Sequence, residues 1–315
     1  MALPLDNRQV TNVITTSWDA RRPRLVDQFF NSNGLFTRLH TKDNIKHEGG
    51  DKIRVGYIYG GLGGGSYGKG DTFDTAQKEF MTEMFFDWKR NYAPVALDNL
   101  DQAKNQGAAR LINLTETLWN TAKLTLADNC GKQIFGDGTG NGGKDMDGLL
   151  NAIATTGTYG GITRSLTDPV GSAILGQVNS TGGPLSLPMI NTSYGSATIS
   201  DEKPDLGITT QTIWNKLWER SQPSERNQAE DLRKIGFDNV RINSMDVIVD
   251  SHCPSGYFFG LNTKFIEFWI MEGHDFRLRG PYDVHNEDSW VGQVILYSNL
   301  ICTSPRLNFV ISNIS

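Results

Sequence analysis

Apolar residues between Asp98 and Ile153 follow the period of an α-helix and then stop at a glycine-rich segment. Two adjacent apolar stripes predict a helix that is buried over a broad face. One stripe consists of Leu111, Leu114 and Leu118, and the other of Ile112, Thr115, Trp119, Ala122 and Leu126. Asp98 and Asp101 suit the helix start, and Gly136 and Gly138 end it. We therefore expect a spine of about 35 residues, roughly 50 Å long, on which other elements are laid.

Strict alternation of apolar and polar positions predicts two β-strands before this helix. One strand carries Ile53, Val55 and Tyr57, and the other carries Phe80, Thr82, Met84, Phe86 and Trp88 at alternate positions. The connection holds seven glycines between Gly60 and Gly70, and it is longer than the about two to five residues of a tight hairpin. We expect a projecting ribbon with a flexible tip, which must find cover outside its own domain.

The remaining patterns predict a mixed α+β chain. Before the ribbon we expect an extended arm over residues 1–25 and a short helix over 25–39 that is broken at Gly34. Residues 155–205 are rich in Gly, Ser, Thr and Pro; their interspersed apolar residues favour ordered loops over a disordered linker. Further strands are predicted at Leu206–Ile208 and over 240–270, with an amphipathic helix around Trp214 between them. Two closing strands are split by Pro305.

Composition adds limits on size, partners and compartment. A chain of 315 residues with 34 glycines is long enough for two lobes. Its formal charge of -5 argues against a basic nucleic-acid binder, although a protein that merely encloses DNA does not need a positive charge. Three widely spaced cysteines without a CxxC pair indicate a reducing cytoplasm. Because no apolar segment is long enough to span a bilayer, we expect neither secretion nor membrane insertion.

Motifs that could carry chemistry are weak. Gly138–Gly143 and Gly63–Gly68 match GxGxxG, but neither match has the strand before it and the helix after it that a phosphate loop needs. The segment that begins at Asp137 imitates a calcium loop, yet Gly148 stands where the twelfth position requires a bidentate Glu. His252 beside Cys253 lacks nearby partners for a metal. We expect no catalytic site, no cofactor and no metal.

The order of segments resembles the major capsid proteins of tailed bacteriophages, which have the Hong Kong 97-type fold. The resemblance covers nearly the whole chain. It is carried in sequence order by "GGDKIRVGYIYGG…GKGDTFD", "FFDWKRNYAPVAL", the long helix, "FGDGTGNGGKDMDGLLNAI", "PDLGITTQTIWNKL", "VIVDSHCPSGYFFGLNTKFIEF" and "SNLICTSPRLNF".

The resemblance implies a division of the chain into four parts. Residues 1–47 would form an N-terminal arm and short helix, and residues 48–90 an extended E-loop ribbon. Residues 91–145 and 286–315 would form a peripheral domain on the spine helix, and residues 146–285 an axial domain.

The resemblance also implies self-assembly into hexamers and pentamers of an icosahedral shell around phage double-stranded DNA, built in the host cytoplasm. Scaffolding protein, portal and a decoration protein would be separate partners. Contacts between subunits are expected at Arg54, Tyr57, Tyr59, Tyr67 and Lys69. Lys69 suits the cross-linking lysine of some family members, but no asparagine partner or catalytic acid is identified, so we predict no cross-link. The alternatives are an encapsulin-type cargo shell and, from another class, a calcium- or glycan-binding module.

Overall fold

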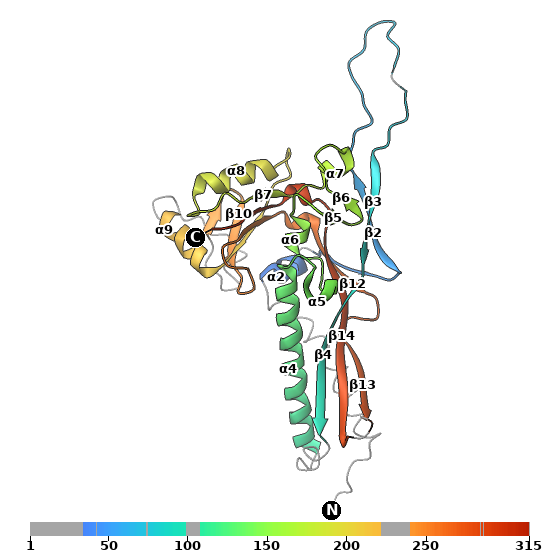
Figure 1. Cartoon of the computed structure of the whole chain (residues 1–315), viewed down its shortest axis with the longest axis vertical. Helices are drawn as coiled ribbons and strands as arrows, with labels where there is room; N and C mark the ends of the chain where they lie inside the picture. Colours follow the sequence, from blue (N-terminus) through green and yellow to red (C-terminus); the bar gives the residue numbers. More distant parts are fainter. Residues whose placement is uncertain are drawn as a thin grey trace, which may run out of the picture.

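The computed structural model describes residues 34–41, 43–73, 75–98, 108–221, 240–283, 285 and 287–314. They form an α+β structure with two larger sheets, a long helix and a two-stranded ribbon. Figure 1 shows the long helix and the long strands beside it as an arm at one end, and the ribbon projecting from the opposite end. Between them lies the body, which holds the six-stranded sheet.

The sheet of the arm is built around one long strand, β14 (Ser289–Cys302). Along one edge it pairs with β4 (Lys89–Asp98) over ten residues, from Ser289 to Ser298. Along the other edge it pairs first with β13 (Arg277–Asp283) and then with β12 (Ile266–Met271). Strand β1 (Ile45–Glu48) adds a parallel edge to β12. The closing strand that was expected before Pro305 is therefore confirmed, as a member of a five-stranded sheet.

Helix α4 (Ala108–Ile134) covers one face of this sheet. Its Trp119, Ala122 and Leu126 are buried in one cluster with Ala93, Val95 and Leu97 of β4 and with Trp290 and Val294 of β14. The expected long helix and its end before Gly136 are confirmed, since the amide of Gly136 turns back to the carbonyl of Gln133. No helix within the described ranges is long and apolar enough to span a bilayer.

The expected start of the helix at Asp98 is wrong, because Asp98 is the last residue of strand β4. Alternate residues of β4 from Asn91 to Leu97 are buried and those between them are exposed, which is the period of a strand and not of a helix. Pro94 is tolerated there because β4 has a partner on only one edge. Asp101 lies outside the described residues.

The body contains a six-stranded sheet in the order β7 (Gln177–Asn179), β15 (Phe309–Ile311), β11 (Phe258–Leu261), β8 (Leu206–Thr209), β10 (Met245–Val249) and β9 (Val240–Ile242). Helices α8 (Leu187–Ala197) and α9 (Gln211–Ser221) bury Ile190, Ile213 and Leu217 in one cluster with Phe258 and Phe309. The predicted strands and the amphipathic helix of this region are confirmed. Strand β15 lies in this sheet, whereas the expected division placed residues 286–315 together beside the long helix.

Residues 155–205 are ordered, as predicted, and contain more regular structure than expected. They form β5 (Thr158–Tyr159), β6 (Ile162–Thr163), α7 (Pro169–Ala173), β7 and α8. Helix α8 was missed, although Ser186 caps it by accepting a hydrogen bond from the amide of Met189, with Pro188 in the first turn. Short helices complete the fold: α2 (Gly34–Thr41), α5 (Gly140–Gly143), α6 (Leu149–Ala152), η1 (Thr263–Phe265) and η2 (Pro305–Leu307).

The glycine-rich segment after α4 forms a structural turn. Asp137 accepts hydrogen bonds from the amide and the hydroxyl of Thr139 at 3.0 and 2.7 Å, and these bonds lower the pKa of its carboxyl group. A Cβ at Gly148 would lie 2.3 Å from the carbonyl oxygen of Gly136. The position that a calcium loop reserves for Glu therefore accepts only glycine in this fold.

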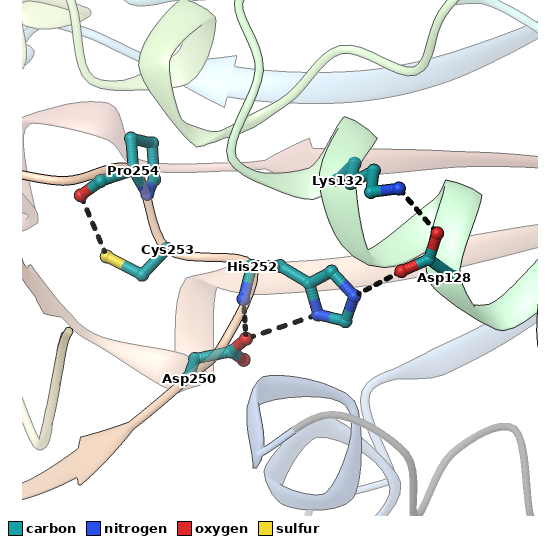
Figure 2. A network of polar contacts seen from close by, with 6 residues as sticks. All are labelled: Asp128, Lys132, Asp250, His252, Cys253 and Pro254. Carbon is teal, nitrogen blue, oxygen red and sulfur yellow. Dashed lines mark hydrogen bonds and ion pairs between the residues drawn. The ribbon is translucent and has the colours of Figure 1, made fainter. Parts of the chain in front are cut away.

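His252 joins the long helix to the body (Figure 2). Its Nε2 lies 3.1 Å from Oδ1 of Asp128 in α4, and its Nδ1 lies 3.4 Å from Oδ1 of Asp250, which follows β10. A Cβ at Gly131 would lie 2.8 Å from Nδ1, so glycine lets the ring approach the helix. Burial raises the pKa of Asp250, while hydrogen bonds from Lys132 and His252 lower the pKa of Asp128. The described part of the chain holds no group of three His, Cys, Asp or Glu side chains suited to a metal.

Candidate assembly site

The projecting ribbon consists of β2 (Lys52–Ile58) and β3 (Met81–Asp87), paired in antiparallel register from Lys52 opposite Asp87 to Ile58 opposite Met81. Both predicted strands are confirmed. The connection between them extends away from the body (Figure 1), and it is closed at its base by hydrogen bonds from the amides of Tyr59 and Gly60 to the carbonyl of Phe80. The ribbon thus has a paired root and a long, unpaired tip.

One face of the root is docked on the body. Ile53, Met84 and Phe86 on this face are at most 3% exposed and belong to the main core cluster. The ring of Phe86 meets Tyr159 of β5 edge to face, with centroids 5.0 Å apart. Tyr57 donates a hydrogen bond of 2.7 Å to the carbonyl of Ala173 in α7, and burial raises the pKa of its phenol. The root is therefore fixed to the hairpin β5–β6 and to α7.

A glycine in the turn of hairpin β5–β6 makes this docking close. Gly160 has a φ of 56°, and its carbonyl accepts a hydrogen bond of 3.0 Å from the amide of Phe85. A Cβ at this position would lie 2.7 Å from Cβ of Met84 and 3.0 Å from Cζ of Phe86. Glycine therefore suits this position for two reasons: it adopts the left-handed backbone readily, and it has no side chain that would clash with Met84 and Phe86.

The opposite face and the tip present large apolar side chains to solvent. The six most exposed are Ile58 at 65%, Leu62 at 66%, Tyr67 at 71%, Phe73 at 66%, Met81 at 55% and Phe85 at 42%. Tyr67 and Phe73 contact each other across the loop, with ring centroids 5.0 Å apart. A soluble chain exposes single apolar residues routinely, but a projecting group of six on one element indicates a surface that another molecule covers.

The five residues predicted to contact other subunits all lie on the ribbon, but they do not form one cluster. Arg54 is exposed on the outer face, with its guanidinium 5.7 Å from the ring centroid of Phe85. Tyr67 and Lys69 are exposed near the tip, and Tyr59 is half-buried at its base. The hydroxyl of Tyr57 is already bonded within its own chain, because it donates a hydrogen bond to the carbonyl of Ala173.

Sequence reasoning missed most of the exposed apolar set, of which it named only Tyr67. A usable signal was present in β3, where Met81 and Phe85 alternate with Met84 and Phe86. A strand with one face in solvent carries polar residues on that face. Apolar residues on both faces of a projecting strand therefore indicate a second partner.

Solved structures with a similar fold are capsid and encapsulin proteins. The capsid asymmetric unit of cyanophage A-1(L) is similar with a TM-score of 0.64 and 14% identity, over 86% of this chain and 90% of that chain. The capsid of Myoviridae phage XM1 has a TM-score of 0.54 and 10% identity, over 90% and 92%. The SrpI encapsulin of Synechococcus elongatus PCC 7942 has a TM-score of 0.53 and 10% identity, over 86% and 85%.

Each of these similarities covers more than four fifths of both chains. No family model matches the sequence, and no curated protein is similar to it in sequence. The similarity therefore lies in the fold and not in residue identities.

Proposed function

We propose that this chain, which has the Hong Kong 97-type fold of tailed-phage capsid proteins, is the major capsid protein of a bacteriophage. Copies of it would form hexamers and pentamers of an icosahedral shell that encloses double-stranded DNA, assembled in the host cytoplasm. Its role would be structural and not enzymatic. The observation that carries the proposal is the ribbon, whose root is fixed to the body while its outer face and tip display six large apolar side chains.

Covering this ribbon would supply a large driving force for assembly. Complete burial of one large apolar side chain is worth roughly 1.5 to 3 kcal/mol. The gain therefore grows with the number of these side chains that a neighbouring surface covers. A shell provides such a surface at every position, because each subunit both donates a ribbon and receives one.

The expected division into parts is retained as a proposal with two changes. Because β12 and β13 pair with β14 in the sheet of the arm, we assign residues 266–271 and 277–283 to the peripheral domain. The arm around α4 would be the peripheral domain, the six-stranded sheet with α8 and α9 the axial domain, and residues 48–90 the E-loop. Because β15 pairs with β7 and β11, we assign residues 309–311 to the axial domain. Residues 1–33, most of the proposed N-terminal arm, lie outside the described residues. Arg54, Tyr57, Tyr59, Tyr67 and Lys69 stay predicted contacts.

The partners that we propose are other copies of the chain, a separate scaffolding protein, a portal and a decoration protein. An encapsulin-type cargo shell is the second candidate, because the similarity to the SrpI encapsulin covers 86% of this chain. A calcium- or glycan-binding module is disfavoured, because Gly148 replaces the closing acid of the loop that begins at Asp137.

Electron microscopy of the purified full-length protein tests the proposal. We expect closed shells or rings of capsomers, and particles from infected cells should contain DNA and not a protein cargo. A folded protein that stays monomeric at high concentration would refute the shell function. Particles that hold a dedicated cargo protein and no nucleic acid would favour the encapsulin candidate.

Two ribbon variants test which feature drives assembly. Deleting Gly61 to Gly68 should leave a folded protein that forms no stable shells. Replacing Leu62, Tyr67 and Phe73 by serine should have the same effect without shortening the loop. The matched control is Leu124→Ser on α4, whose side chain is 65% exposed but lies away from the ribbon. Normal shells from both ribbon variants would show that the ribbon is not the E-loop of the assembly.

A further inference from the structure

The side chain of His252 lies between two carboxylates that belong to different parts of the chain (Figure 2). Its Nε2 is 3.1 Å from Oδ1 of Asp128 in the long helix α4, and its Nδ1 is 3.4 Å from Oδ1 of Asp250, which follows β10. The amide of His252 also donates a hydrogen bond of 2.9 Å to Oδ1 of Asp250. We call Asp128, His252 and Asp250 the histidine bridge. One imidazole ring thus joins the arm to the body.

The body side of the histidine bridge is buried and incompletely hydrogen-bonded. Only 16% of the His252 side chain and 2% of the Asp250 side chain are exposed. A Cβ at Gly131 would lie 2.8 Å from Nδ1 of the ring, so the ring rests directly on the backbone of α4. Nδ1 of His252 and Oδ2 of Asp250 are both buried, and neither has a hydrogen-bond partner among the described residues. Buried polar atoms without partners are rare, and here two of them belong to side chains that contact each other.

The protonation state of the ring decides how many hydrogen bonds the histidine bridge can contain. A neutral imidazole donates from only one of its two nitrogens, whereas an imidazolium donates from both. In either neutral tautomer, one nitrogen lone pair therefore faces a carboxylate. A second proton turns that contact into a charge-assisted hydrogen bond, and the charge also strengthens the bond on the other side. Protonation thus changes the bridge from one donated hydrogen bond to two.

The charged groups around the ring favour its protonated form. On α4, Lys132 lies 2.5 Å from Oδ2 of Asp128, and hydrogen bonds from Lys132 and His252 lower the pKa of this carboxyl group. On the body side, burial raises the pKa of Asp250, which means that its negative charge is costly there without a positive neighbour. The thiol of Cys253 is uncharged, because burial raises its pKa to about 12. Two carboxylates and one ammonium leave a negative charge in excess, which an imidazolium cancels.

We propose that the histidine bridge is a pH-dependent switch, which holds α4 to the body more tightly when the ring of His252 is protonated. Histidine is the side chain whose charge normally changes between about pH 5 and 8. The bridge is strong at the acid end of this range and weak at the alkaline end. This inference concerns the hold of the body on the arm within one chain, and it does not depend on the proposed shell function.

The direction of the pH effect follows from which state binds more protons. A bridge that is stronger when protonated makes the folded protein bind more protons than the unfolded chain does, so its contribution to stability is lost as the pH rises. The raised pKa of Asp250 acts in the same direction. The lowered pKa of Asp128 acts in the opposite direction, but only at a more acidic pH, where that carboxylate becomes protonated. Within the range in which histidine titrates, stability should therefore fall as the pH rises.

Hydrogen exchange of the unassembled full-length protein at about pH 5.5 and about pH 8 tests the switch. After correction for intrinsic exchange, the α4 amides around Asp128 should be about tenfold more protected at the lower pH. In His252→Gln the difference should shrink to less than about twofold, because glutamine keeps one donor but takes up no proton. Asp128→Asn should reduce the difference as well. The matched control is His47→Gln, at an exposed position of β1, which should behave as the wild type does.

The outcomes decide the role of His252 independently of assembly. Circular dichroism checks that each variant folds, and Asp128→Asn, at a half-exposed position, provides the test if His252→Gln does not fold. Equal protection at both pH values in the wild type, or greater protection at the higher pH, refutes the switch. A full difference that persists in His252→Gln, or in Asp128→Asn, also refutes it. Failure of the wild type to form shells would refute the proposed function and would leave this measurement unchanged.

Discussion

Replacing Gly160 by alanine should loosen the root of the ribbon, and Gly161 provides a matched control. The two glycines are the central residues of the turn between β5 and β6, with φ values of 56° and 80°, as a type I′ turn requires. Alanine costs roughly 1 to 2 kcal/mol at either position, because a left-handed backbone crowds its Cβ. This cost is common to both variants and cancels in their comparison.

Only the substitution at position 160 adds a packing clash. Its Cβ would lie 2.7 Å from Cβ of Met84, 3.0 Å from Cζ of Phe86 and 3.1 Å from Cγ of Met84, whereas no atom lies within 4 Å of a Cβ at position 161. Forcing one extra carbon into a packed core costs about 1 to 3 kcal/mol. We therefore expect Gly160→Ala to destabilise the protein by about 1 to 3 kcal/mol more than Gly161→Ala does.

Urea unfolding of the unassembled full-length protein, followed by tryptophan fluorescence, measures this difference. Hydrogen exchange locates it, because the amide of Phe85 bonds to the carbonyl of Gly160 and should exchange faster in the Gly160→Ala variant alone. Equal unfolding free energies within about 0.5 kcal/mol, with unchanged exchange in β3, would refute the tight docking of the ribbon root.

Three further predictions concern buried polar side chains and thiols. The side chain of His252 contacts Asp250, whose own side chain is only 2% exposed. His252→Ala should therefore lower the free energy of unfolding in urea by about 1 to 3 kcal/mol. Asp128→Asn should lower it by less, because Asp128 contacts the other nitrogen of His252 and is half-exposed. Arg164 donates hydrogen bonds to the carbonyls of Asn151, Ala152, Thr156 and Ile174. Arg164→Met should therefore lower the free energy of unfolding in urea by about 3 kcal/mol or more. As a control, Arg54→Met on the exposed ribbon face should change it by less than about 0.5 kcal/mol. Burial raises the pKa of Cys130, Cys253 and Cys302 to about 12. Because the thiolate is the reactive form, the folded protein should not react with a thiol reagent at pH 8. Fast labelling of any cysteine before unfolding would contradict its burial.

Local periodicity predicted the elements that alternate or repeat strongly. The end of α4, both ribbon strands, β8, α9 and β14 follow from spacing and from glycine or proline at their ends. The start of α4 was misplaced because an acidic residue such as Asp98 suits a helix N-terminus as well as a strand end. Asn91, Ala93, Val95 and Leu97 carried the opposing signal at period two, but Pro94 among them disguised a strand at a sheet edge.

Partners in space could not be predicted from local pattern. The residues of β15 are apolar and extended, and nothing in them specifies pairing with β7 and β11 instead of the arm strands. The docking of the ribbon depends on Gly160 meeting Met84, residues that lie far apart in sequence. The Gly160–Gly161 pair alone predicts a tight hairpin turn, but not the surface on which that hairpin rests.

The single strand β14 has a mechanical consequence. Its first ten residues pair with β4, its last five pair with β12, and the chain then continues through η2 into β15 of the other sheet. Tension applied to the tip of the arm runs along this strand and loads its ladder of hydrogen bonds in shear, so that many bonds must yield together. A peeling force would break them one at a time. In the proposed shell, a pull along the arm of a subunit would therefore be carried by many hydrogen bonds at once.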